Sequence, residues 1–213
     1  MMKRATLIAT TIACIGSPAG AATLSKSYSY FYIGGSTMEE IEAELSKRGP
    51  HVSASNSRHP GATQMQFTTQ LAFTHGKDVC QIIDAKTTVS VKVILPKWRR
   101  PHKADNDVRL VWDVLASDIK RHEESHVVIA KNYGRELEQA LMAMGRQKNC
   151  DAVSAKAKTI TDTVLARHEK AQAEFDRVEG KNFESRIVRL LQHRLEQMAG
   201  HTSSPKAKMD RPI

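Results

Sequence analysis

The sequence predicts an α+β fold in which a small, mostly antiparallel sheet comes first and long helices follow. In the first half of the chain, apolar residues alternate with polar ones, which is the period of a half-buried strand. In the second half they recur at spacings of three and four, the period of an amphipathic helix. A length of 213 residues suits one domain with extensions.

The first 21 residues have the features of a secretory signal peptide. Lys3 and Arg4 give a positive start, an apolar run follows, and an A-x-A cleavage motif ends at Ala21. The run is too short to span a bilayer, and no later stretch is long and apolar enough to do so. We therefore expect a mature protein that is periplasmic or secreted.

Removal of the signal leaves two cysteines, Cys80 and Cys150. An even pair in an exported chain indicates one disulfide, here between the strand region and the end of the first long helix. The alternative is two unrelated free thiols.

The formal charge of +9 becomes +7 (9 − 2) without Lys3 and Arg4. Such an excess favours weak association with anionic envelope surfaces. We expect no nucleic-acid partner, because no aromatic stacking platform accompanies the charge. The oligomeric state does not follow from the sequence.

Aromatic and β-branched residues predict a first strand at 28–33. Ser36 with Glu39 then forms a capping box for a short helix that stops near Gly49. Residues 51–62 are polar and turn-rich. Alternation predicts further strands at 65–73 and 89–95, with a turn at 74–78 and a short strand at 79–83 between them.

A long helix is expected over about residues 107–144, where Gly134 marks a possible bend. A second helix covers about 151–178. Together with the strands these helices make a domain at 22–180. Residues 181–199 read as a basic amphipathic helical extension, and residues 200–213 as a disordered tail.

The first long helix contains an H-E-x-x-H motif that begins at His122. His122 and His126 project from one helical face, so both can reach one metal ion. They stand where apolar residues are expected, and Glu123 flanks the same stripe. Burying these groups without a partner is costly, and zinc is the simplest partner. The alternatives are core histidines satisfied by hydrogen bonds, or incidental surface histidines.

Glu123 is the candidate general base of a zincin-like site, since it follows the first histidine directly. Glu124 falls among Lys120, Arg121 and Lys131 and is read as a surface charge.

A catalytic zinc normally takes three protein ligands and leaves one position for water. The metzincin spacing would need a histidine at position 132, where the chain has Asn132. The simple thermolysin-like spacing would need a glutamate at position 146, where it has Arg146, so both spacings are excluded for the third ligand. The second long helix can fold back and carries His168, Asp176 and Glu179. We choose His168, because imidazole suits zinc. Glu179 or Asp176 is the alternative, and Asp176 can also orient a ligand histidine.

At this point the chain resembles a bacterial family of predicted secreted zinc-dependent proteases, a domain of unknown function with an H-E-x-x-H motif. The likeness covers about residues 28–180 and includes the placement of the cysteines. It is carried by Tyr30-Phe31-Tyr32-Ile33-Gly34-Gly35-Ser36-Thr37, Leu95-Pro96-Lys97-Trp98, His122-Glu123-Glu124-Ser125-His126 and Phe175-Asp176. The family often continues from the aspartate through threonine to histidine and glycine. Here Arg177-Val178-Glu179-Gly180-Lys181 stands instead, which leaves the third ligand open.

The leading hypothesis is an exported zinc metallopeptidase that acts on peptides or proteins, with Zn²⁺ held by His122, His126 and His168 and with Glu123 as the base. The alternative is a catalytically degenerate binding or structural protein of the envelope with the same fold. A zinc site that only stabilises the helix pair is a third possibility.

Overall fold

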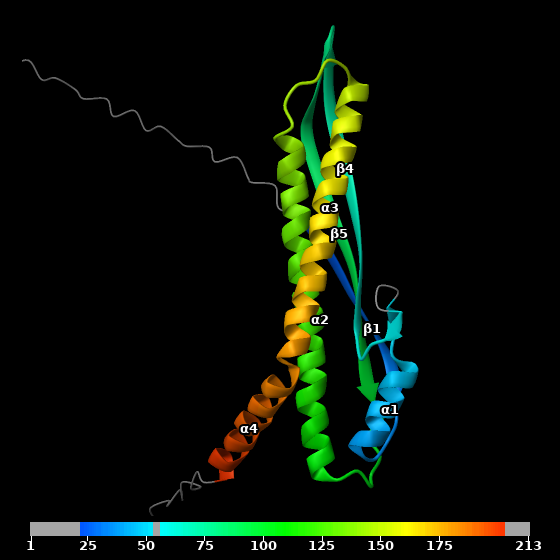
Figure 1. Cartoon of the computed structure of the whole chain (residues 1–213), viewed down its shortest axis with the longest axis vertical. Coiled ribbons are helices and arrows are strands. Elements are labelled where there is room, and N and C mark those ends of the chain that lie inside the picture. The colour runs from blue at the N-terminus through cyan, green and yellow to red at the C-terminus, as the bar shows by residue number, and fades with distance from the viewer. Residues whose placement is uncertain (1–21, 53–55, 203–213) are drawn as a thin grey trace, which may run out of the picture.

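The computed structural model describes residues 22–52 and 56–202 and has the α+β architecture that the sequence predicts. β1 (Thr23–Ile33), β4 (Ala62–Gly76) and β5 (Val79–Trp98) form one sheet. The long helices α2 (Asn106–Met142) and α3 (Cys150–Lys181) run beside it (Figure 1). The smaller elements are α1 (Met38–Arg48), β2 (His51–Val52), β3 (Ser57–Arg58) and α4 (Phe183–Thr202).

The sheet is mixed rather than mostly antiparallel. Its order is β1-β5-β4, with β1 parallel to β5 and β4 antiparallel to β5. The chain between β1 and β4 crosses through α1 and the β2-β3 pair, which lets β1 run parallel to β5. β4 therefore lies at an edge of the sheet, and this edge later bounds the candidate site.

β5 is one strand of 20 residues, whereas the sequence predicts two strands at 79–83 and 89–95. The polar residues between them are held in the ladder by pairing with β4, as in Lys86 with Gln70. The turn predicted at 74–78 is confined to Lys77 and Asp78, and Asp78 adopts a positive φ of 64°. Tertiary pairing here overrides the local pattern.

The predicted helices agree with α2, α3 and α4 to within a few residues. In α1 the N-cap is Thr37 rather than Ser36, and Thr37 accepts a hydrogen bond from the Glu40 backbone N–H at 3.3 Å. Gly134 has a packing role. A Cβ there would lie 2.5 Å from Val89 Cγ2, so glycine lets α2 approach β5 closely.

Three apolar clusters hold the layers together. One joins β5 to the middle of α2, and includes Val89, Val93, Ile119, Val127 and Ala130. A second cluster joins the first residues of β5 to the end of α2 and to α3. A third joins α1 to the start of α2. The first cluster fixes the central turns of α2, which carry the H-E-x-x-H motif, against the sheet.

The predicted disulfide is confirmed. Cys80 and Cys150 are bonded, with a Cα–Cα distance of 5.1 Å and a sequence separation of 70. The bond joins the start of β5 to the first residue of α3, next to a backbone bridge between Cys80 and Gln147.

Two other predictions fall on the ends of the chain. The signal peptide at residues 1–21 lies outside the described residues, as do residues 203–213 of the predicted tail. The part of that tail within the described residues belongs to α4. Among the described helices, none combines the length and the apolar character needed to cross a membrane.

Candidate metal centre

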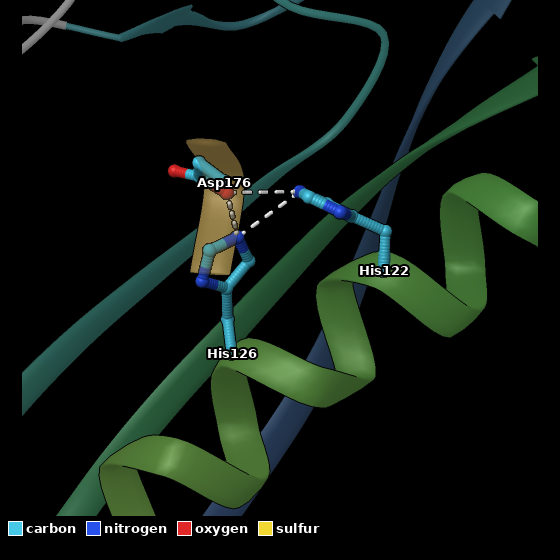
Figure 2. A group of neighbouring side chains, drawn as sticks. All are labelled: His122, His126 and Asp176. Carbon is cyan, nitrogen blue, oxygen red and sulfur yellow. Dashed lines mark hydrogen bonds and ion pairs between the residues drawn. The ribbon is translucent and has the colours of Figure 1, made fainter. Parts of the chain in front are cut away.

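His122 and His126 lie one turn apart on α2, and their rings converge. The two Nε2 atoms are 3.1 Å apart, and the ring planes are nearly perpendicular at 82° (Figure 2). Phe175 of α3 packs against both rings, with centroid distances of 5.1 Å. This contact limits the rotation of the two imidazoles and keeps both Nε2 atoms on the same side.

Asp176 completes the group from the neighbouring helix α3. Its Oδ1 lies 2.9 Å from His126 Nε2 and 3.2 Å from His122 Nε2. Burial by itself raises the pKa of Asp176, but hydrogen bonds from His122 and His126 hold it well below its usual range. Figure 2 shows the carboxylate and both imidazoles meeting at one point between the two helices.

The three donors fit a metal such as zinc. Ligand atoms about 2.0–2.1 Å from a tetrahedral zinc are about 3.3 Å from one another. The observed separations of 2.9, 3.1 and 3.2 Å are close to that edge length. All three atoms lie within 4.8 Å of one another, and no further His, Cys, Asp or Glu among the described residues joins the group.

Glu123 lies beside these donors and is almost fully buried, with 5% of its surface exposed. Thr63 Oγ1 donates to Glu123 Oε2 at 2.7 Å and to the Glu123 backbone carbonyl at 3.1 Å. Burial raises the pKa of Glu123, against the opposing effects of the Thr63 hydrogen bond and the two nearby histidines. Such a carboxyl group is suited to gain and lose a proton closer to neutral pH.

Gly61 permits this burial. A Cβ at Gly61 would lie 2.8 Å from Glu123 Oε1 and 2.9 Å from Ile119 Cγ2, so any larger residue would displace the carboxylate. Gly61 and Thr63 flank the start of the edge strand β4, and they were not singled out from the sequence. The only local signal is Pro60-Gly61, which indicates a turn but not what the turn approaches.

Gln172 orients the ring of His126 by contacting Nδ1, the ring nitrogen that is not part of the donor group. His126 Nδ1 donates to Gln172 Oε1 at 2.5 Å, and Gln172 Nε2 donates to the His126 backbone carbonyl at 3.2 Å. A proton on Nδ1 leaves Nε2 free to bind a metal. Gln172 was also missed. A signal exists, because it lies four residues from both His168 and Asp176 on α3.

His168 is not part of the donor group. It is buried, with 6% of its surface exposed, and packs edge-on against Phe67 and Tyr133. Gln172 Nε2 lies 2.8 Å from His168 Nε2, so His168 reaches the centre only through Gln172. Burial lowers the pKa of His168, which favours the neutral ring that can accept this hydrogen bond.

Glu179 is also outside the donor group but belongs to a charged network next to it. Its Oε2 lies 3.8 Å from His122 Nδ1 and 3.3 Å from Arg186 Nη2, and it pairs with Arg121. Asp118, which is 4% exposed, accepts hydrogen bonds from Arg121 at 2.9 Å and from Arg186 at 3.0 and 3.2 Å. Arg186 thus ties α4 to α2 and α3 directly beside the histidines.

This network also affects titration. Burial by itself raises the pKa of Asp118, but hydrogen bonds from Arg186 and Arg121 hold it below its usual value. Glu124 is outside the donor group. It is half-buried and pairs at 2.8 Å with Lys26 of β1, a partner that the sequence did not indicate.

The donor group opens into a cavity of about 190 Å³. Its lining consists of Val52, His59, Gly61, Ala62, Thr63, Met65, His122, Glu123, His126, Gln172 and Asp176. The start of β4 thus forms one wall and the motif helix another.

Comparison with known families identifies the domain. The model of a bacterial protein family of unknown function, DUF922, matches residues 28–183, which is 156 of the 213 residues. The chain belongs to this family. The DUF922 match includes both helices of the candidate centre and ends where α4 begins. The resemblance to a bacterial domain of unknown function is thereby confirmed, while the protease activity stays a prediction.

The chain matches no curated protein and no solved structure. Membership of DUF922, a family of unknown function, therefore assigns no activity to this chain.

Proposed function

We propose that this protein is an exported zinc-dependent metallopeptidase with a zincin-like site. One observation carries the proposal. Donor atoms of His122, His126 and Asp176 converge from two helices beside the buried carboxylate of Glu123. Two imidazoles, one ligand carboxylate and an adjacent buried carboxylate make up the residue set that hydrolytic zinc sites use.

In this proposal Asp176 replaces His168 as the third ligand. His122 and His126 would bind through Nε2, and Asp176 through Oδ1. Bound zinc supplies a water molecule of lowered pKa and polarises the carbonyl of the scissile peptide bond. Gln172 keeps the Nδ1 proton on His126 and so keeps Nε2 available.

Glu123 acts as the general base. Thr63 fixes its Oε2 through a hydrogen bond of 2.7 Å. The carboxylate takes a proton from the attacking water and later delivers it to the leaving amine. Its burial, which raises its pKa, supports both the uptake and the release.

An extended peptide is the substrate class that suits the surroundings. β4 is an edge strand, and its first residues Ala62, Thr63 and Met65 line the cavity. A substrate segment can pair with such an edge through main-chain hydrogen bonds and bring its backbone to the donor group.

Two alternatives are less well supported. A purely structural zinc site would need a fourth protein ligand, and the described residues supply only three donors at this point. A degenerate binding protein is expected where a third ligand is missing, but Asp176 offers one. Export rests on the signal-like segment at the start of the chain.

Glu123→Gln tests the proposal. Purified mature protein should contain about one zinc per chain by elemental analysis and should cleave a casein-type protein substrate. The Gln variant should retain zinc and lose activity by about 10²–10⁴-fold, because only the base is removed. Glu124→Gln is the matched control, with the same chemical change one residue away at a group that faces Lys26.

Full activity in Glu123→Gln would refute the assignment of the base. Wild-type protein that binds no zinc at micromolar concentrations would refute the metallopeptidase proposal itself.

A further inference from the structure

A second cavity of about 400 Å³ lies beside the candidate metal centre. Most of its lining is apolar, and the residues come from α1, α2, α4 and the segment before β4. They are Met38, Ile41, Glu42, Leu45, Ser46, Arg58, His59, Pro60, Val111, Leu115, Phe183 and Ile187. A volume near 400 Å³ is within the range of about 300–1,000 Å³ that is usual for ligand pockets.

The two cavities share a wall. His59 lines both of them, Pro60 lines the larger one and Gly61 the smaller one. Both cavities also lie along the same helix. Leu115 faces the larger one and Glu123 the smaller one, eight residues apart, which is about 12 Å along the axis at 1.5 Å per residue.

This spacing relates the apolar cavity to an extended chain. At about 3.3 Å per residue, a peptide whose backbone lies at the donor group reaches 12 Å in about four residues. Because His59 already bounds both cavities, a side chain two to four positions from the reacting bond falls at the larger one.

We propose that this cavity is a specificity subsite for a large apolar side chain, such as leucine, isoleucine, phenylalanine or methionine, of the peptide substrate. The assignment rests on the proposed function and adds the class of sequence that the enzyme selects. The occupant follows from continuity with the metal centre and from the lining, in which eight of the twelve residues are apolar. Part of the wall belongs to α4, so the selectivity depends on an element that begins where the DUF922 match ends.

Ser46→Trp is the test variant. Ser46 is an exposed residue of α1 that lines the cavity, so a tryptophan there fills the space without disturbing a buried contact. Lys47→Trp is the matched control, because it adds the same side chain at the next exposed position, which is not part of the lining. The assay is cleavage of a mixed peptide library by the zinc-loaded mature protein, read by mass spectrometry.

Wild-type protein and Lys47→Trp should prefer a large apolar residue over glycine or aspartate at one position, two to four residues from the cut, by at least about tenfold in kcat/KM. In Ser46→Trp this preference should fall to about twofold or less, while the zinc content stays equal to that of wild type and Lys47→Trp. Wild-type cleavage without an apolar preference, or an unchanged preference in Ser46→Trp, would overturn the subsite and leave the metallopeptidase proposal standing.

A direct binding measurement separates the two proposals further. A fluorescein-labelled peptide with a central leucine should bind zinc-loaded Glu123→Gln at least about tenfold more tightly than the same peptide with glycine. Adding Ser46→Trp should abolish the difference. If no cleavage occurs with any protein, the proposed function fails, and equal binding of the two peptides would then refute the subsite independently.

Discussion

Asp176 contributes the one donor that does not come from the H-E-x-x-H motif. Substitution Asp176→Asn keeps the shape of the side chain and removes its charge. Because a neutral amide is a poor zinc ligand, we expect zinc affinity to fall by at least 100-fold in competition with a chromogenic chelator. Glu174→Gln on the exposed side of α3 is the control and should leave affinity unchanged. If wild type and Asp176→Asn bound zinc with equal affinity, the third ligand would have to be Glu179 or His168.

Gln172 acts on the metal centre only through His126 and His168. In Gln172→Leu the imidazole of His126 loses the acceptor that holds its Nδ1 proton. Zinc affinity should therefore fall by about 10–100-fold, the usual cost of losing an outer-shell partner. Gln197→Leu, an exposed site on α4, is the control for the substitution. A Gln172→Leu protein with wild-type affinity would show that packing against Phe175 alone orients the ring.

How far the site was predictable from sequence depends on the range of each interaction. His122, Glu123 and His126 follow from spacing within one helix, and the structure brings all three to one cavity. The observed donor group contains Asp176 in place of the expected His168, because each residue position along α3 rotates a side chain by about 100°. Whether position 168 or 176 meets His122 and His126 depends on how the two helices are aligned, and a single-sequence pattern does not contain that alignment.

At the level of the elements, α4 is held by an ion network rather than by an apolar seam. Arg186 is its anchor, with Asp118 and Glu179 as partners. In Arg186→Gln the buried Asp118 loses two charged hydrogen bonds, worth about 1.5–3 kcal/mol together with their desolvation. We expect the melting temperature to fall by about 5 °C at pH 7. Arg189→Gln, exposed one turn further along α4, is the control.

The ion pair between Asp118 and Arg186 predicts that stability depends on pH. The folded-state pKa of Asp118 lies below its ordinary value of 3.8, so its contribution to stability is present above about pH 4 and is lost as the pH falls. The difference in melting temperature between wild type and Arg186→Gln should therefore shrink below pH 4, as followed by circular dichroism. A difference that stays constant down to pH 3 would contradict this role of Asp118.

The elements also show where local patterns are insufficient. The three long helices follow from apolar spacings of three and four. The unbroken strand β5 does not, since its middle residues Lys86 and Thr88 are polar and are held by β4. The direction of β1 is likewise a property of the pairing. These features arise from contacts between distant segments, which propensity and periodicity do not report.

For the whole molecule, the Cys80–Cys150 bond, with a sequence separation of 70, closes a loop that contains α2 and all of β5 except its first residue. In the loop-entropy model, closing a loop of this length stabilises the folded state relative to the unfolded chain by about 4 kcal/mol. A Cys80→Ser, Cys150→Ser double variant should therefore lose about 2–4 kcal/mol in urea unfolding. Asp176 lies 26 residues beyond Cys150, about 39 Å along α3. Zinc content of the folded variant should thus stay near one per chain, and loss of zinc without unfolding would mean that the bond sets the alignment of the helices.

The attachment of α4 has a consequence for the history of the family. Asp118 and Glu179 lie inside the DUF922 match, whereas Arg186 lies just beyond it. A related chain without this helix would leave two acids facing a single arginine next to its histidines. Positions 118 and 186 should therefore covary, and homologues that end early should carry a neutral residue at position 118.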